Sequence, residues 1–222
     1  MNERDLRESL IHACQQMNAL GINQGTSGNI SIRHGDTMLI SPSATPYHLI
    51  EPDMVAAMPI EGEYGSWTGP KKPSTEWRFH LDIMRARPDV HAIVHSHPTF
   101  ATTLAIARKP IEACHYMVAA FGSTDIRCAP YATFGTKELS VHALAALQDR
   151  MGCLLANHGM IALGETLDKA MWRAVELETI ARQYYYALLL GQPHILSAAD
   201  IDATLDQFAG YGIEDDAPAS AA

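Results

Sequence analysis

Two histidines one residue apart offer the most direct chemistry in this chain. His95 ends the segment 91–95, whose apolar and β-branched residues are typical of a buried strand. Side chains along a strand point to alternate sides, so the imidazoles of His95 and His97 are expected to lie close together on one side. Neutral imidazole nitrogen is a good zinc ligand, and the pair therefore indicates a metal site. A chain with 11 histidines can also contain such a pair by chance, so further ligands are required.

Two further residues can complete such a site. Glu76 lies in the first turn of a helix that is expected to begin at Ser74 or Thr75 and to end at Pro88. The helix dipole alone also favours an acid in that turn, so Glu76 can be purely structural. His158 follows an expected buried strand and precedes a glycine, in a place where functional sites are often built. The residue types leave both interpretations open.

Hydrophobic periodicity, capping residues and chain breakers indicate the elements that must position these side chains. Helices are expected at 3–20, 74–88, 99–107, 137–148 and 166–190, and a last one from Ser197 to Gly210, with Thr166 and Ser197 as caps. Short strands are expected at 30–32, 38–40, 55–60, 91–95, 126–131, 153–156 and 160–163. No linker or repeat interrupts them, so we expect one domain over residues 1–213 and a disordered, acidic and alanine-rich tail over 214–222.

Two loops rich in hydroxyl groups can bind an anion. The loop 25–29 reads Gly-Thr-Ser-Gly-Asn and feeds a strand, and such a loop can turn several backbone N–H groups toward one point. The turn 41–46 carries hydroxyl groups as well. No Gly-Lys-Ser/Thr sequence follows the first loop, which is therefore not a Walker loop. Each loop taken alone can equally be an ordinary tight turn.

Composition and charge argue against several classes of protein. The 222 residues carry a formal net charge of -9, which argues against a nucleic-acid or anionic-membrane partner. The N-terminal residues lack the apolar core of a signal peptide, and no run of about 18 apolar residues occurs, so no membrane span is expected. The cysteines show no close spacing, which indicates reduced thiols and a cytoplasmic protein. They are Cys14, Cys114, Cys128 and Cys153.

Six short segments occur in an order that resembles the class II aldolase/adducin family. They are 25–29, 73–80, 94–97, 115–117, 128–136 and 157–159. The matching pieces extend from Leu20 to Tyr211, which is nearly the whole chain. The resemblance implies an α/β fold of the α+β type, in which a central, mainly antiparallel sheet is flanked by helices in three layers. It also implies a homotetramer with active sites between subunits.

The resemblance further implies a zinc site formed by Glu76, His95, His97 and His158. Three imidazoles and one displaceable carboxylate are typical of catalytic zinc, and Mn²⁺ or Co²⁺ can occupy such a set as well. The implied reaction is the reversible cleavage of a ketose 1-phosphate between C3 and C4 into dihydroxyacetone phosphate and a small aldehyde. Zinc bound to the C2 and C3 oxygens would stabilise the enediolate that this cleavage leaves behind.

Other site residues of the family map onto matching positions of this chain. Glu76 would transfer a proton once it leaves the metal, and burial is expected to raise the pKa of its carboxyl toward the working range. Tyr116 would reach in from a neighbouring subunit to handle the proton on the aldehyde oxygen, and Tyr211 would close over the substrate. The positions that match the phosphate site are Thr26, Asn29, Ser43, Ser74 and Thr75.

Within the family, the segments around Tyr116 and Phe134 favour the branch whose substrate is L-fuculose 1-phosphate, with lactaldehyde as the aldehyde product. Aldolases of 5-deoxypentulose 1-phosphates, 4-epimerases, dehydratases and decarboxylases are the alternatives among the enzymes. Glu76 argues against the epimerases, which normally have Asp at this position. A non-catalytic adducin-type interaction module is a weaker alternative, because such modules lack the metal ligands. Ala44 and Thr75 stand where the aldolases have Gly and Ser.

Overall fold

A seven-stranded sheet forms the centre of the protein, which is described over residues 2–208 by a computed structural model. The sheet has the strand order β3-β2-β1-β4-β9-β8-β7, and every neighbouring pair is antiparallel except β7 and β8. Its strands are β1 (Asn29–His34), β2 (Thr37–Ile40), β3 (Ala56–Pro59), β4 (Ala92–Ser96), β7 (Cys128–Ala129), β8 (Gly152–Leu155) and β9 (Gly159–Gly164). A small second sheet pairs β5 (Ile111–Glu112) with β6 (Asp125–Ile126). The expected central, mainly antiparallel sheet is therefore confirmed.

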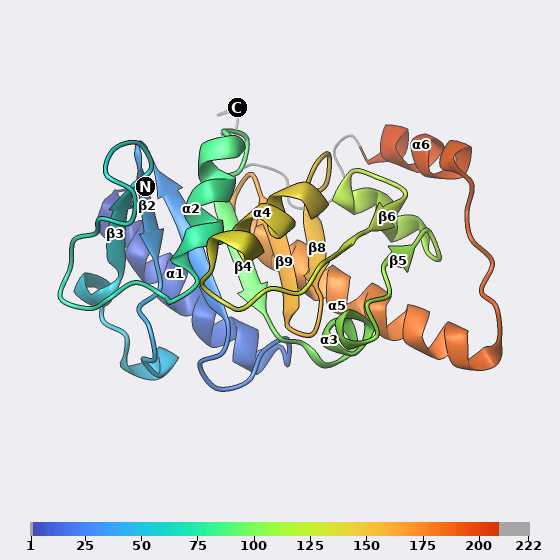
Figure 1. The fold of residues 1–222 in the computed structure, drawn as a ribbon, viewed down its shortest axis with the longest axis horizontal. Coiled ribbons are helices and arrows are strands. Elements are labelled where there is room, and N and C mark those ends of the chain that lie inside the picture. The colour runs from blue at the N-terminus through green and yellow to red at the C-terminus, as the bar shows by residue number, and fades with distance from the viewer. Residues whose placement is uncertain (1, 209–222) are drawn as a thin grey trace, which may run out of the picture.

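Helices cover both faces of this sheet and produce three layers (Figure 1). The α-helices are α1 (Glu3–Ala19), α2 (Trp77–Ala86), α3 (Thr99–Ile106), α4 (Lys137–Ala146), α5 (Leu167–Leu190) and α6 (Ala198–Gln207), and the 3₁₀ helices are η1 (Tyr47–Leu49), η2 (Pro52–Met54) and η3 (Tyr116–Phe121). Helices α1, α3 and α5 pack on one face, and α2 and α4 pack on the other. In the described part of the chain, no helix combines the length and the apolar character needed to cross a membrane.

The central strands are buried on both faces, which explains why they read as continuous apolar runs. Along β4, Ala92 and Val94 pack into the core beneath α1, α3 and α5, whereas Ile93 packs into the core beneath α2 and α4. By the same alternation, His95 lies on the face that α2 covers. The strand thus delivers a polar side chain to the edge of an apolar core, where α2 begins.

Side-chain caps fix most of the helix starts that the sequence predicts. The Thr166 hydroxyl accepts the N–H of Lys169, and Ser197 forms a capping box with Asp200, as expected. The predicted N-cap of α2, Ser74 or Thr75, is wrong by one to two residues: the N-cap is Glu76, and the helix begins at Trp77. The reason is local, since the Ser74 hydroxyl accepts the backbone N–H of Glu76 at 3.2 Å and forms a turn before the helix.

The expected strand 126–131 is also wrong, because the chain there changes sheets. β6 pairs with β5, whereas β7 pairs in parallel with β8. Pro130 follows directly, and it has no N–H with which to continue a ladder. The expected tail over 214–222 lies outside the described residues.

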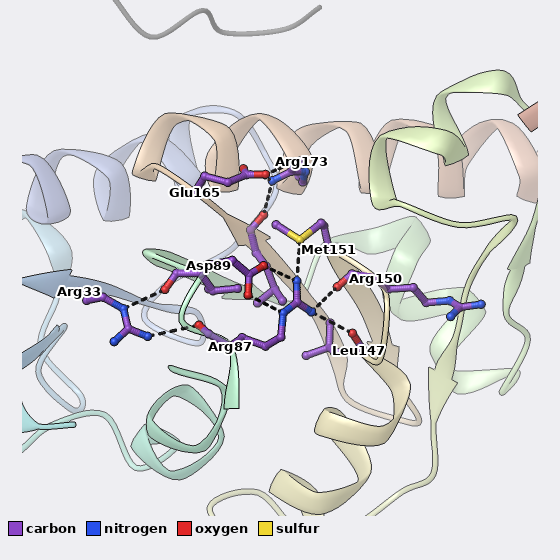
Figure 2. Close-up of polar contacts among 10 residues, drawn as sticks. Arg33, Arg87, Asp89, Leu147, Arg150, Met151, Glu165 and Arg173 are labelled. Atoms are coloured by element: carbon purple, nitrogen blue, oxygen red, sulfur yellow. Dashed lines mark hydrogen bonds and ion pairs between the residues drawn. The ribbon is translucent and has the colours of Figure 1, made fainter. Parts of the chain in front are cut away.

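Arginine side chains form hydrogen bonds to carbonyl oxygens at the carboxyl-terminal ends of α2 and α4 (Figure 2). Arg87 makes two hydrogen bonds to the carboxylate of Asp89, at 2.9 and 2.7 Å, and donates to the carbonyl oxygens of Leu147 and Arg150. Arg33 reaches from β1 to the carbonyl oxygens of Met84 and Val90. Helix ends leave carbonyl groups without partners within the helix, and these guanidinium groups satisfy those of Met84 and Leu147. The network ties α2 to β1 and to α4.

Candidate metal centre

Four side chains from three separate segments meet where β4 ends. His95 and His97 come from the end of β4, His158 from the loop between β8 and β9, and Glu76 from the residue before α2. One donor atom from each lies within 4.8 Å of the others. The Nε2 atoms of His95 and His97 are 2.9 Å apart, and the Glu76 carboxylate lies 3.1 Å from Nε2 of His95 and 3.2 Å from Nε2 of His158. The structure therefore brings together all four residues that were predicted as ligands.

The loop between β8 and β9 places His158 beside β4. Leu155 pairs with Gly159, which leaves a three-residue hairpin loop at the edge of the sheet where β4 also ends (Figure 1). Asn157 in this loop has φ 55°, a left-handed conformation that asparagine tolerates better than most residues. Its side-chain oxygen accepts a hydrogen bond from Arg108, and its backbone N–H donates to Ala105, which fixes the loop to the end of α3.

Gly159 is required by the close approach of two strands. A Cβ at this position would lie 2.5 Å from the carbonyl oxygen of Ser96 and 2.6 Å from Cδ2 of His97. Neither distance is compatible with a normal contact. The imidazole of His97 thus occupies the space that a side chain at residue 159 would need.

The hydrogen bond of His95 defines which of its nitrogens faces the site. Its Nδ1 lies 2.9 Å from the carbonyl oxygen of Met160, which can only accept, so Nδ1 carries the proton. In the neutral ring, the lone pair of Nε2 is then directed at His97, His158 and Glu76. The three rings stand edge to face around this point, with centroids 4.8 to 4.9 Å apart. A backbone carbonyl that orients an imidazole in this way is typical of metal ligands.

The electrostatics of the cluster depend on its burial and on its short internal distances. Burial raises the pKa of the Glu76 carboxyl, but the adjacent His95 and His158 lower it by more, so its net pKa lies below the ordinary range. The expectation of a raised pKa is therefore wrong, because the imidazoles outweigh desolvation. For His95, burial opposes the charged form, but the Glu76 carboxylate raises its pKa. Burial, together with His95 and His158, lowers the pKa of His97 to about 3.

The donor set fits a divalent cation. Oε1 of Glu76 is buried and accepts no hydrogen bond from the described residues, although Nε2 of His158 lies 3.2 Å away. A buried carboxylate oxygen without a donor is costly. A cation bound among these atoms removes this cost. Three imidazole nitrogens and a carboxylate oxygen are ligands that zinc and neighbouring divalent metals accept.

A pocket opens beside this cluster and combines hydroxyl groups with an apolar wall. Its lining includes Glu76, His97 and His158 from the candidate metal centre. The remaining lining residues are Thr26, Ser27, Ser43, Ala44, Thr75, Tyr131, Ala132, Phe134 and Asn157. The two hydroxyl-rich loops and the segment before α2 thus converge on one space.

The residues predicted to hold a phosphate fall into two groups. Thr26, Ser43 and Thr75 line the pocket. Asn29 and Ser74 are buried behind it, beside Glu76. The Asn29 amide donates to Oε2 of Glu76 at 3.0 Å, and the Ser74 hydroxyl accepts the Glu76 N–H. In this structure Asn29 and Ser74 position Glu76.

Tyr116, one of the two predicted catalytic tyrosines, does not join the cluster in this structure. Tyr116 begins η3, is 46% exposed, and is not among the residues that line the pocket. Its ring lies 4.7 Å from that of His115 and 6.3 Å from that of Phe208, measured between centroids. Tyr211 lies outside the described residues.

Two residues beside the site were not singled out by the sequence. His80 lies 2.5 Å from the side-chain oxygen of Asn29 and 2.8 Å from the hydroxyl of Ser31. The sequence spacing could have indicated both residues. His80 follows Glu76 by one helical turn, and Ser31 follows Asn29 by one strand repeat, so each lies on the same side of its element as a predicted site residue. Nothing in the sequence shows that these two pairs face each other.

Comparison with known proteins identifies the class to which this site belongs. The family described as Class II Aldolase and Adducin N-terminal domain matches residues 8–185, and the chain belongs to this family. Class II aldolases are metal-dependent, which agrees with the cluster around Glu76.

Individual relatives are similar over almost the full length. The chain is 51% identical over 207 residues to a 5-methylthioribulose-1-phosphate/5-deoxyribulose-1-phosphate aldolase of Rhodospirillum rubrum, a match that covers 93% of this chain and 92% of the relative. It is 42% identical over 214 residues to an L-fuculose phosphate aldolase of Escherichia coli, covering 96% and 98%. A solved structure of L-fuculose 1-phosphate aldolase superposes with a TM-score of 0.88 at 36% identity, covering 92% of this chain and 96% of that one.

Proposed function

We propose that this protein is a zinc-dependent aldolase that reversibly cleaves a ketose 1-phosphate into dihydroxyacetone phosphate and a small aldehyde. The observation that carries the proposal is the convergence of Glu76, His95, His97 and His158 beside a pocket lined with hydroxyl groups. The pocket would place a bound cation next to a group of hydroxyl donors. This arrangement suits a substrate whose phosphate lies near a carbonyl group. Residues 1–213 would form the single domain that carries this site.

Zinc is the proposed metal, and the four clustered side chains are its proposed ligands. The site offers three imidazole nitrogens and one carboxylate, with Nε2 of His95 directed inward by the Met160 carbonyl. Mn²⁺ or Co²⁺ would be accepted by the same donors. A divalent cation held there would supply Lewis-acid stabilisation of the negative charge that develops when the C3–C4 bond breaks.

The phosphate of the substrate would bind among the hydroxyl groups of the pocket. Thr26, Ser43 and Thr75 are close enough to one another to line a single space. Hydroxyl and backbone N–H donors bind phosphate without a net positive charge, which agrees with an acidic chain. Ser74 and Asn29 would support this wall from behind.

Proton transfer is assigned to Glu76 and to two tyrosines. The Glu76 carboxylate belongs to the candidate metal site and also lines the pocket, which suits a base that acts on the substrate. Tyr116 lies away from the pocket of its own chain, so we propose that it enters the pocket of a neighbouring subunit in a homotetramer. Tyr211 would close over the bound substrate. A cytoplasmic location is proposed because the four cysteines are all free.

The aldehyde half of the substrate would lie against Tyr131, Ala132 and Phe134. This wall suits an apolar group, such as the methyl or methylthio end of a 5-substituted pentulose 1-phosphate. The 51% identity to the Rhodospirillum rubrum enzyme supports that substrate class. L-Fuculose 1-phosphate is the second candidate, because a 42% identical relative and the superposed structure carry that name.

Other functions of the family are less well supported by the site. An epimerase is disfavoured by Glu76, as the sequence indicates. A dehydratase or decarboxylase would use a similar metal set, and product analysis separates both from an aldolase. An adducin-type interaction module would not need a cluster of four potential metal ligands, and this chain has such a cluster.

The test is an assay of the purified protein in both directions. Cleavage of 5-deoxyribulose 1-phosphate should release dihydroxyacetone phosphate and acetaldehyde, and cleavage of L-fuculose 1-phosphate should release dihydroxyacetone phosphate and lactaldehyde. The ratio of kcat/KM for the two substrates selects between them. Condensation of dihydroxyacetone phosphate with a panel of aldehydes provides the reverse measurement. Product with the carbon skeleton unbroken would contradict an aldolase.

A further inference from the structure

A buried chain of hydrogen bonds leads away from the candidate metal centre into the protein. The Asn29 amide donates to Oε2 of Glu76 at 3.0 Å. The Asn29 side-chain oxygen lies 2.5 Å from Nε2 of His80, and Nδ1 of His80 lies 2.8 Å from the Ser31 hydroxyl. The four side chains therefore form one continuous path, Glu76–Asn29–His80–Ser31.

Secondary structure places these side chains opposite one another. Glu76 and His80 are four residues apart at the start of α2, so they lie on the same side of the helix. Asn29 and Ser31 are two residues apart on β1, so they point to the same face of the sheet. The helix pair and the strand pair face each other, and Asn29 contacts both members of the helix pair.

Each hydrogen bond in the path has only one possible direction. The Asn29 side-chain oxygen can only accept, so Nε2 of His80 must donate. Nδ1 of a neutral imidazole then accepts, so the Ser31 hydroxyl donates to it. Because His80 holds the Asn29 oxygen, the Asn29 NH₂ group must face Glu76. A flipped amide would turn its oxygen toward a carboxylate and leave His80 without an acceptor.

Solvent does not substitute for any of these bonds. His80 and Ser31 are fully buried, and Asn29 and Glu76 are 4% and 5% exposed. A buried polar group that loses its partner is not compensated by water. The orientation of the Asn29 side chain is therefore set by its hydrogen bond to His80 and not by water.

We propose that His80, held by Ser31, is a positioning residue that fixes the Asn29 amide and thereby aims the Glu76 carboxylate at the three imidazoles. His80 itself contacts none of the four clustered ligands through a hydrogen bond. This role rests on the proposed place of Glu76 among the metal ligands, but not on the identity of the sugar.

The test uses cobalt binding, which requires no substrate. Co²⁺ replaces zinc in nitrogen and oxygen sites, and its visible absorption reports the arrangement of the ligands. His80→Phe keeps a ring but removes both hydrogen bonds. It should weaken Co²⁺ and Zn²⁺ binding by roughly 10- to 100-fold, the usual effect of losing an outer-shell partner of a metal ligand, and alter the cobalt spectrum. His80→Gln keeps an N–H donor toward Asn29 and should recover most of the affinity.

A matched pair of serine variants separates positioning from general destabilisation. Ser31→Ala removes the partner of His80, whereas Ser140→Ala removes another buried hydroxyl that bonds to α2, through Asp82. Ser31→Ala should weaken metal binding by several-fold, and Ser140→Ala should leave the metal affinity and the cobalt spectrum unchanged. An unchanged metal affinity and spectrum in His80→Phe would overturn the proposal.

The imidazole of His80 in the intact zinc protein provides a measurement without any substitution. Nitrogen-15 NMR should show the neutral tautomer with the proton on Nε2. A proton on Nδ1 would overturn the proposal, even if His80→Phe failed to fold. If the aldolase assay failed while these results held, the positioning role would stand and the proposed reaction would not.

Discussion

The two oxygens of Glu76 have different surroundings, and this difference supports the two roles proposed for the residue. Oε2 accepts the Asn29 amide and lies 3.1 Å from His95, whereas Oε1 is buried without a hydrogen bond from the described residues. One oxygen is thus held by the protein, and the other is open to a cation. A carboxylate held at one oxygen can leave a metal and still remain next to the substrate.

Replacing Glu76 by Gln tests this division of roles. The variant keeps the shape of the side chain but removes its charge and its capacity to accept a proton. We expect kcat to fall by about 10²- to 10⁴-fold, the usual contribution of general acid–base catalysis. Zinc content should fall less, because three imidazoles remain. Steady-state kinetics and metal analysis of the same preparation give both values.

The control for this variant is Glu165→Gln. Glu165 pairs with Arg173 at 2.8 Å, away from the pocket lining. Its kcat and zinc content should match those of the unmodified protein. If Glu76→Gln also retained full kcat, proton transfer by Glu76 would be excluded.

At the scale of elements, the candidate metal centre depends on how closely β9 approaches β4. Gly159 begins β9 directly after His158, and its missing side chain leaves room for the His97 imidazole. The positions of His97 and His158 therefore both depend on a glycine at residue 159. Strand pairing, and not the ligands themselves, brings residues 97 and 158 together.

Gly159→Ala should disturb this arrangement. The added methyl group would lie within 2.6 Å of His97, so the ring or the strand must shift. We expect zinc affinity to fall by at least tenfold in competition with a chelator. Ile161→Val, in the same strand, should cost about 0.5–1.5 kcal/mol of stability and leave zinc affinity unchanged. Equal zinc affinity in the two variants would contradict the close packing at Gly159.

The turn at Ala44 shows a second consequence of backbone geometry. Ala44 has φ 50°, in the left-handed region, which glycine adopts without steric cost but alanine does not. Ala44→Gly should therefore raise the free energy of unfolding by roughly 0.5–1 kcal/mol. Ala145→Gly, in helix α4, should instead lower it by about 1 kcal/mol. Urea denaturation measures both, and a loss of stability in Ala44→Gly would show that the alanine is not strained.

At the scale of the whole molecule, the pocket of one chain is lined by Glu76, His97 and His158 of the cluster but not by Tyr116. For Tyr116 to act in the reaction, it must come from another copy. The proposed homotetramer supplies it, because in a ring each subunit can offer Tyr116 to its neighbour.

Mixed oligomers test this arrangement. His95→Ala lacks a metal ligand, and Tyr116→Phe lacks the phenol hydroxyl, so each variant alone should be inactive or slow. After co-refolding in equal amounts, random mixing should restore about a quarter of the activity, because one site in four receives both intact residues. No gain above the separate variants would contradict a shared active site. Size-exclusion chromatography coupled to light scattering confirms that the mixture has assembled.

Much of the whole-molecule organisation can be predicted from sequence, and the failures have local causes. Caps at Thr166 and Ser197 locate two helices, because capping depends on residues only a few positions apart. The start of α2 is misplaced because Ser74 bonds to Glu76 in a turn instead of capping the helix. The family is predicted correctly because its short segments keep their order along the chain. The role of His80 cannot be predicted in this way, since it depends on two elements that face each other.

The most direct measurement is the coordination of zinc in the purified protein. X-ray absorption at the zinc edge, with metal analysis, should show one zinc per chain bound by three imidazoles at about 2.0–2.1 Å and by oxygen. His158→Ala should reduce the number of imidazoles to two. No stoichiometric zinc, or a full set of three imidazoles in His158→Ala, would contradict a centre built from Glu76, His95, His97 and His158.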